Sequence, residues 1–261
     1  MSIKFEKIES KYLKKIMNIS VYIPDEYKNQ ELPILYFLHG RTGNENILHQ
    51  LDIDQTADKL ISNQIISPLI IVCPSMDNSR GINSSNKYQE IKGKYGIINK
   101  GLYENYLVKE VITYIEQKYR IINKRTFRYI GGISAGGYIA LHIGLKYSNL
   151  FSKIGGHMPA IDMYFEDEDE CYFENEQMWR KYDPLTLAQN YNGQNLKVFL
   201  DDGNQDEGKF YLACKKLYTI LKSKNVEVEN YVFKGKHDIN YVLSNIESYL
   251  KFYNNGCINN S

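Results

Sequence analysis

Phe127-Arg-Tyr-Ile-Gly-Gly-Ile-Ser134-Ala-Gly-Gly-Tyr-Ile-Ala-Leu-His142 is the stretch of this chain that decides its fold. It begins as a run typical of a β-strand, passes through a serine flanked by glycines, and continues as an apolar helix. Within it, Gly132-Ile-Ser134-Ala-Gly136 fits G-x-S-x-G, a strand-to-helix turn that presents a serine hydroxyl at the top of a sheet. Glycine is needed on both sides because the serine takes a strained backbone and neighbouring side chains would collide. We therefore predict that Ser134 is a nucleophile.

Strand-like and helix-like segments alternate on both sides of this stretch. Almost continuous apolar runs, or alternating patterns, predict strands within residues 1–24 and at 33–38, 69–73, 153–156, 196–200 and 226–233. Helical spacing predicts helices at 44–63, 103–119, 183–188, 210–221 and 239–253. This alternation predicts an α/β fold with a mostly parallel central sheet covered by helices on both faces.

Three segments depart from the alternation. Residues 77–101 are polar and long for a connection, which indicates a functional loop. Residues 162–183 combine a dense acidic cluster with aromatic residues, so we predict a cap or lid insertion; a solvated surface insertion is the alternative. Residues 254–261 are expected to be a frayed tail.

Length and charge limit the possible classes of protein. At 261 residues the chain is expected to form one domain over residues 1–261. A net charge of +1 argues against a nucleic-acid partner. No apolar run approaches the length that spans a bilayer, so no membrane partner is expected. The composition says nothing about the oligomeric state.

The cysteines and the first residues indicate a compartment. Cys73, Cys171, Cys214 and Cys257 are far apart and form no CxxC or Cys/His pair, so we interpret them as ordinary thiols with no zinc site. Residues 1–15 are charged throughout and lack the apolar segment of a signal peptide. The expected location is the cytoplasm.

A serine becomes a nucleophile only when a base takes its proton and an acid orients that base. We predict that His237 is the base, because it lies between the last strand and the last helix, where Gly235 lets the chain turn. The remaining histidines fit less well: two lie within helices, His157 precedes the insertion, out of order for a base, and His39 precedes a glycine loop.

The acid is expected on a loop after a strand and before the base. Asp206 in Leu200-Asp-Asp-Gly-Asn-Gln-Asp206 is the preferred candidate, with Asp202 and then Asp201 as alternatives. The oxyanion hole needs two backbone amides, for which we predict Ala135 and Arg41, with Thr42 as an alternative to Arg41.

The substrate pocket is expected between the 77–101 loop and the 162–183 insertion. We predict that His39, which also shapes the oxyanion loop, Tyr106 and Trp179 contribute to substrate binding, although the last two are equally compatible with packing roles.

With these residues placed, the chain resembles the esterase D-like branch of the α/β-hydrolase superfamily, also called the "putative esterase" family. That branch includes S-formylglutathione hydrolases, feruloyl esterases, enterochelin-type esterases and mycolyltransferases. The resemblance is carried by Ser20-Val-Tyr-Ile-Pro24 with Pro33-Ile-Leu-Tyr-Phe-Leu-His-Gly40, by Tyr103–Arg120, and by the turns at 132–136, 203–206 and 235–238.

The resemblance implies a serine carboxylesterase that needs no metal or other cofactor and that hydrolyses a small-molecule ester or thioester through an acyl-enzyme. An acyltransferase or thioesterase of a biosynthetic pathway, using the same three residues, is the alternative within enzymes. A binding protein on a hydrolase scaffold is the alternative from another class.

Overall fold

Apolar runs of the sequence form the middle strands of one large sheet. The computed structural model describes residues 2–94, 96–193 and 195–254. Its eight-stranded sheet consists of β1 (Ser2–Ser10), β2 (Lys15–Ile23), β3 (Ile34–Leu38), β4 (Ile70–Pro74), β7 (Arg128–Ile133), β8 (Lys153–His157), β9 (Lys197–Gly203) and β10 (Glu227–Phe233). Every residue of β3, β4, β7 and β8 is buried, as expected for strands covered on both faces.

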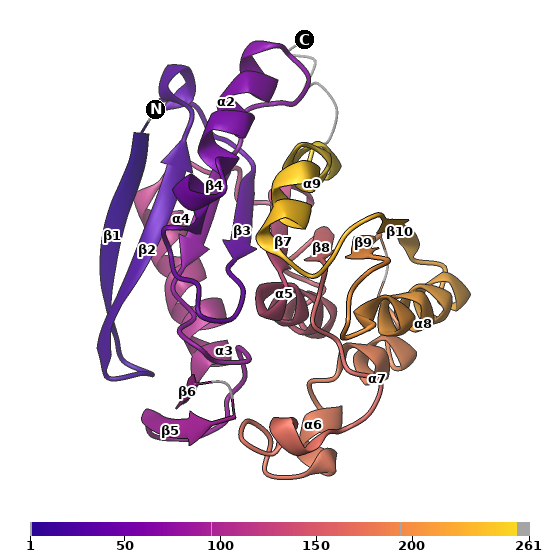
Figure 1. Cartoon of the computed structure of the whole chain (residues 1–261). Helices are drawn as coiled ribbons and strands as arrows, with labels where there is room; N and C mark the ends of the chain where they lie inside the picture. Colours follow the sequence, from indigo (N-terminus) through magenta and orange to yellow (C-terminus); the bar gives the residue numbers. More distant parts are fainter. Residues whose placement is uncertain (1, 95, 194, 255–261) are drawn as a thin grey trace.

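The sheet order is β1-β2-β4-β3-β7-β8-β9-β10 (Figure 1). β1 and β2 pair antiparallel, β2 pairs antiparallel with β4, and all pairs from β4 to β10 are parallel. The prediction of a mostly parallel sheet is therefore confirmed. Because parallel strands end at the same edge, the loops after β3, β7, β9 and β10 meet there.

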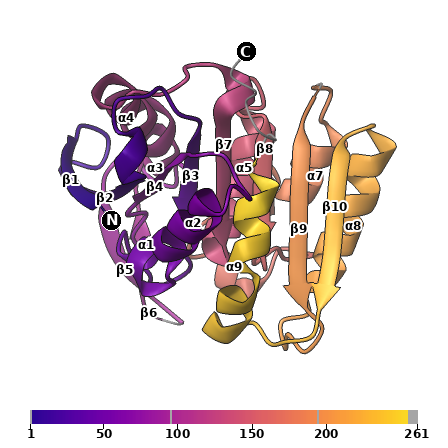
Figure 2. The same cartoon turned by 90° about the horizontal axis from the view of Figure 1, so that it is seen from above.

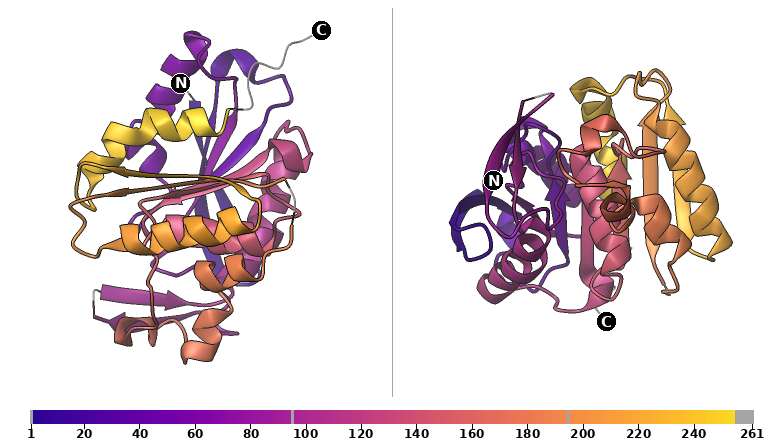
Figure 3. Two further views of the ribbon diagram at one scale, coloured as in Figure 1. Left: turned by 90° about the vertical axis from the view of Figure 1, so that its right-hand side faces the viewer. Right: turned by 90° about the horizontal axis from the view of Figure 1, so that it is seen from below.

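Helices cover both faces of the sheet. They are α1 (Ile47–Gln50), α2 (Ile53–Ser62), α3 (Tyr103–Asn105), α4 (Ile112–Lys118), α5 (Ala135–Lys146), α6 (Glu176–Arg180), α7 (Pro184–Gln189), α8 (Phe210–Ser223) and α9 (Ile239–Phe252). α2 and α9 lie on one face, and α4, α5 and α8 lie on the other (Figures 2 and 3). In the part of the chain that the structure describes, no helix has the length and apolar character needed to cross a membrane.

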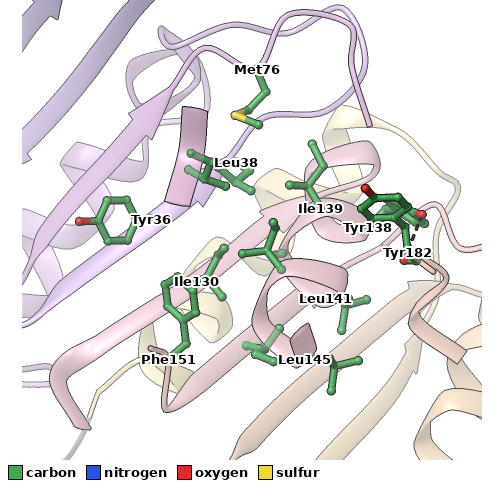
Figure 4. Packing of buried hydrophobic residues seen from close by; sticks show 14 of the residues in the cluster. Tyr36, Leu38, Met76, Ile130, Tyr138, Ile139, Leu141, Leu145, Phe151 and Tyr182 are labelled. Atoms are coloured by element: carbon green, nitrogen blue, oxygen red, sulfur yellow. Dashed lines mark hydrogen bonds between the residues drawn. The ribbon is translucent and has the colours of Figure 1, made fainter. Parts of the chain in front are cut away.

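The helix that follows Ser134 lies in the centre of the core. All residues of α5 from Ala135 to Leu145 are buried. Figure 4 shows its side chains Ile139, Leu141 and Leu145 among residues of the same cluster, including Ile130 of β7 and Phe151. Burial of apolar side chains on this scale contributes about 1.5–3 kcal/mol each. The turn at Ser134 therefore leads directly into a rigid, buried helix.

Two sequence predictions differ from the structure in detail. The helix predicted at 44–63 is divided into α1 and α2, because Asp52 between them has a left-handed backbone with φ 50°. The segment 77–101, predicted as a loop, contains a β-hairpin of β5 (Gln89–Gly93) and β6 (Gly96–Lys100). Pairing of Ile91 with Ile98 in this hairpin places two apolar side chains together within an otherwise polar segment.

The helix predicted at 103–119 forms with an irregular middle. It runs from α3 to α4 through a π-helical stretch at Tyr106–Val111. Residues 255–261, most of the predicted tail, lie outside the described residues, as does Cys257.

The acidic insertion 162–183 is fastened by a buried arginine that the sequence analysis did not single out. Nη2 of Arg80 lies 3.6 Å from Oδ2 of Asp162 and 3.5 Å from Oδ1 of Asp169. Its guanidinium also lies over the rings of Tyr138 of α5 and Tyr172 of the insertion. Part of the acidic cluster therefore neutralises a buried cation, and the rings of Tyr138 and Tyr172 pack against it.

Candidate active site

Ser134 occupies the turn between β7 and α5. Its backbone has φ 54° and ψ −117°, a conformation that a residue with a side chain rarely adopts. The turn is held by hydrogen bonds: the Ser134 amide donates to the carbonyl of His157 (3.0 Å), and the Ser134 carbonyl accepts from the amides of Tyr138 and Ala160. The side chain is partly exposed. The turn therefore presents the serine as its sequence predicts.

The two flanking glycines allow this turn to pack against the end of β3. A Cβ atom on Gly136 would lie 2.2 Å from the carbonyl oxygen of Leu38 and 2.5 Å from that of His39. A Cβ atom on Gly132 would lie 2.6 Å from the Leu38 carbonyl oxygen. These contacts with backbone atoms cannot be relieved by a rotamer change, so both positions require glycine. The same packing brings the loop after β3 to the serine.

His237 reaches the serine from the loop after β10. The hydroxyl oxygen Oγ of Ser134 lies 2.8 Å from Nε2 of His237, within hydrogen-bond distance. On the other side of the imidazole ring, Nδ1 lies 3.5 Å from Oδ2 of Asp206. Ser134, His237 and Asp206 are thus aligned as hydroxyl, imidazole and carboxylate, the order that activates a serine. Ser134 and His237 are more than a hundred positions apart in the sequence.

Asp206 is fixed by the start of α8. Its Oδ1 accepts a hydrogen bond from the amide of Gly208 (2.9 Å), and its Oδ2 accepts one from the amide of Phe210 (3.2 Å). The Phe210 ring also packs against the His237 ring, with centroids 5.3 Å apart. No sequence motif indicates this double role of Phe210, because a phenylalanine at the start of a helix belongs to no characteristic pattern.

The loop after β3 lies beside the serine in a defined orientation. A Cβ atom on Gly40 would lie 3.4 Å from Cβ of Ser134. The Gly40 carbonyl is held by Nδ1 of His39 (2.8 Å) and by the amide of Gly43 (3.0 Å). In a trans peptide the N–H points opposite to the C=O. The Arg41 amide, which shares this peptide with the Gly40 carbonyl, therefore points away from His39 and Gly43.

The Ala135 amide is the first of α5. As the first residue of the helix, Ala135 has no intrahelical partner for its N–H. Among the described residues, no backbone carbonyl accepts a hydrogen bond from it. Its N–H is thus available to a ligand oxygen at the positive end of the helix dipole.

Arg41, in the loop after β3, carries a charge that reaches both the imidazole and the insertion. Its positive charge acts on both His237 and the hydroxyl of Tyr172. It also lines a small pocket of about 10 Å³ that the β5–β6 hairpin and the insertion enclose, with Asn78, Lys94, Ile98, Glu168 and Tyr172. Residues 77–101 and 162–183 therefore meet beside the loop after β3.

The three residues predicted to bind substrate lie inside the protein. His39 is 1% exposed; Nδ1 bonds to the Gly40 carbonyl, and Nε2 accepts from the Met76 amide at 2.9 Å. It shapes the loop, and both nitrogens are occupied by backbone groups. Tyr106 is 0% and Trp179 3% exposed. This burial corrects the prediction that the three side chains line the pocket, because packing positions of this kind offer no surface to a ligand.

Asp201, one alternative for the acid, belongs to a different network. Its Oδ1 lies 3.5 Å from Nδ1 of His157, and its Oδ2 accepts hydrogen bonds from the hydroxyls of Tyr241 and Tyr249 (2.8 Å each). Nε2 of His157 lies 2.8 Å from the Tyr253 hydroxyl. Asp201 and His157 are 0% exposed, so this second aspartate–histidine pair ties β8 and β9 to α9 and reaches no substrate.

One group of side chains has the spacing of a metal site. Within the described residues, Asp202, Asp206 and His237 each place one nitrogen or oxygen atom within 4.8 Å of the other two. Within this group, Nδ1 of His237 and Oδ2 of Asp206 face each other at 3.5 Å. A cation there would separate His237 from Asp206, so we assign these atoms to that pair and not to a metal.

A serine on a strained strand-to-helix turn, with an imidazole and a carboxylate in line on this sheet, defines a serine hydrolase of the α/β-hydrolase fold. The family model described as "Putative esterase" matches residues 10–246. The chain belongs to this esterase family, and it is a carboxylic ester hydrolase. This outcome confirms the resemblance drawn from the sequence.

Individual relatives are distant but match over nearly the whole chain. S-formylglutathione hydrolase of Bos taurus is 22% identical over 94% of this chain and 92% of its own length. The structure of an S-formylglutathione hydrolase from Agrobacterium tumefaciens has a TM-score of 0.79 at 19% identity, covering 97% of both chains. Fluorophosphonate-binding serine hydrolase F of Staphylococcus aureus has a TM-score of 0.76 at 20% identity, covering 97% of this chain and 98% of its own.

Proposed function

We propose that the chain hydrolyses a small-molecule ester or thioester through an acyl-enzyme, with Ser134 as nucleophile, His237 as base and Asp206 as acid. The observation that carries this proposal is the 2.8 Å contact between Oγ of Ser134 and Nε2 of His237. The carboxylate of Asp206, 3.5 Å from Nδ1, favours the tautomer that carries its proton on Nδ1 and leaves Nε2 able to accept a proton.

The reaction proceeds in two steps. Ser134 attacks the substrate carbonyl while His237 takes the hydroxyl proton, and the amides of Arg41 and Ala135 donate hydrogen bonds to the oxyanion. His237 then gives the proton to the leaving alcohol or thiol, which departs and leaves Ser134 acylated. Water, deprotonated by His237, attacks the acyl group, and the acid is released with Ser134 restored.

A short acyl group is the proposed preference of the site. The relatives named above include hydrolases of S-formylglutathione, a thioester whose acyl group has one carbon. We propose on this basis that turnover decreases as the acyl chain becomes longer.

The test combines a covalent probe with an ester series. We expect a fluorophosphonate probe to label Ser134, and p-nitrophenyl acetate to be hydrolysed at least tenfold faster, by kcat/KM, than the octanoate. Each additional methylene that does not fit a pocket costs about 1–3 kcal/mol. Equal turnover of acetate and octanoate would contradict the short-acyl proposal. Absence of labelling in folded protein would favour a binding protein on this scaffold.

Added alcohols and thiols separate a hydrolase from an acyltransferase. We expect the free acid to remain the main product when an acceptor is present. Ester or thioester formation in preference to the acid would assign the chain to acyl transfer, with the same Ser134 chemistry.

The activity is expected to decrease in acid. Burial lowers the pKa of His237 below its ordinary value of 6.5, and the Asp206 carboxylate opposes this shift. Only neutral His237 accepts the serine proton, so activity is present above the lowered pKa and is lost as pH decreases through it. A profile of kcat/KM against pH should therefore reach half of its plateau below pH 6.5. A midpoint above that value would contradict the lowered pKa of His237, and loss of the acid limb altogether would contradict the assignment of His237 as the base.

We propose that residues 162–183 act as a cap over the site and that the protein works in the cytoplasm. The pocket contacts of Glu168 and Tyr172 support the first proposal. The free thiols of Cys73, Cys171 and Cys214 support the second, because unpaired cysteines are typical of a reducing compartment.

A further inference from the structure

A second buried carboxyl group lies beside Asp206. Asp202, near the end of β9, is 0% exposed, and one of its oxygens lies within 4.8 Å of atoms of both Asp206 and His237. Its Oδ1 accepts a hydrogen bond from the Gly203 amide at 2.8 Å. Its Oδ2 is fully buried and receives no hydrogen bond from any donor among the described residues. A bare carboxylate oxygen in such a position is costly.

The hydrogen bonds of the two carboxyl groups are unequal. Asp206 accepts from two amides and faces the imidazole, and these donors stabilise its ionised form. Asp202 accepts from one amide only. Two negative charges this close in a buried site repel each other strongly, so the pair is stable with one shared proton. The unequal donors place the charge on Asp206 and the proton on Asp202.

We propose that Asp202 is a positioning residue that is protonated at neutral pH and donates a hydrogen bond from its carboxyl to the Asp206 carboxylate. This contact satisfies the bare oxygen and holds Asp206 against His237. The proposal rests on the assignment of Asp206 as the catalytic acid. No bond is made or broken: the proton stays on Asp202 throughout the reaction, and Asp202 touches neither substrate nor Ser134.

The surroundings of Asp202 favour the neutral form. The titratable groups beside it are Asp206 and His237 on the two loops and Cys214 on α8; Asp201 on β9 and Tyr241 on α9 act on it by charge from the other face of the sheet. Burial, followed by the charge of Asp206, raises the pKa of Asp202 to about 8. Asp202 is therefore expected to lose its proton, and with it the hydrogen bond to Asp206, as pH increases through about 8.

The pH profile of activity tests this arrangement. We expect kcat/KM of the wild type for p-nitrophenyl acetate to decrease as pH increases through about 8, after subtraction of spontaneous hydrolysis. In Asp202→Asn the amide still donates to Asp206 but cannot ionise, so the alkaline decrease should move upward by about one pH unit or more. Glu207→Gln, an exposed change in the loop that carries Asp206, should retain the wild-type profile. An alkaline limb at the same pH in wild type and Asp202→Asn would overturn the proposal.

A second variant distinguishes the effect of the hydrogen-bond donor at position 202 from the effect of side-chain volume there. Asp202→Val has a similar shape and no donor, so we expect it to lower kcat by about tenfold, whereas Asp202→Asn retains most of the rate. Equal losses in the two variants would overturn the role of the hydrogen bond.

Infrared spectroscopy on the folded wild type gives a readout independent of turnover. At pH 7 the difference spectrum between wild type and Asp202→Asn should contain the C=O stretch of a protonated carboxyl, and this band should disappear as pH increases past about 8. Absence of the band would show that Asp202 is ionised and would end the proposal. Failure of the wild type to hydrolyse any ester would instead refute the proposed function, and the infrared result would still decide the protonation of Asp202.

Discussion

Replacing Ser134 by alanine is expected to lower kcat by about a thousandfold to a millionfold, because the variant has no oxygen to form the acyl-enzyme. The hydroxyl accounts for the 2.8 Å contact with Nε2 of His237, and no other described hydroxyl shares it. The measurement is the rate of p-nitrophenyl acetate hydrolysis, with labelling by a fluorophosphonate probe in parallel. Alanine retains a Cβ atom at φ 54°, so the backbone strain and the folded state should be little changed.

Two controls make this result specific. Ser152→Ala removes another largely buried serine hydroxyl, which bonds to the Thr126 carbonyl at the opposite end of the strands, and should keep wild-type turnover. The double variant Ser134→Ala, His237→Ala should lose about as much activity as Ser134→Ala alone, since residues that act as one unit are not additive. Near-wild-type turnover in Ser134→Ala, or a double variant that loses the product of the two single effects, would contradict the proposed triad.

Replacing Gly136 by alanine is expected to lower the free energy of unfolding by about 3 kcal/mol or more and kcat/KM by about a hundredfold. The added Cβ atom would lie 2.2 Å from the Leu38 carbonyl oxygen, so α5 must move away from the end of β3. That movement separates Ser134 from the loop that carries the Arg41 amide. Denaturant unfolding and ester hydrolysis measure the two effects.

Gly137→Ala is the matched control one residue along the same helix. Its added Cβ atom would lie 3.0 Å from the Gly132 carbonyl oxygen and from Pro159, a tight contact that small shifts can relieve. We expect it to cost clearly less stability and activity than Gly136→Ala. If the two variants lose equal stability, or if Gly136→Ala unfolds like the wild type, the turn does not depend on close packing against β3.

Local patterns predicted the parts of this protein whose physics is local. A glycine-flanked serine between a strand and a helix indicates its own turn, because the backbone strain and the space beside the serine depend on adjacent residues. Apolar runs indicate buried parallel strands for the same reason. The hairpin β5–β6 was missed because its two isoleucines, Ile91 and Ile98, form an apolar pair only after the strands are joined.

The choice among Asp201 and Asp202, at the end of β9, and Asp206, just after it, shows where local patterns end. Side chains alternate along a strand, so Asp201 and Asp202 point to opposite faces of the sheet. Asp201 therefore meets the tyrosines of α9, whereas Asp202 lies with the residues on the α8 side. Asp206, four residues further on, is carried by the loop to a point 3.5 Å from His237. The residue type is the same at all three positions, so the sequence alone does not show which aspartate faces His237.

The sequence by itself determined the class of fold and the position of the strand-to-helix turn at Ser134, and it predicted that the acid and then the base follow this turn. Each of these depends on residue type and spacing along the chain. The tertiary structure alone decided which carboxylate faces His237, which way the Arg41 peptide points, and that Arg80 fastens the acidic insertion. These features depend on contacts between segments that are far apart in sequence, and such contacts exist only when strands, helices and loops have packed together.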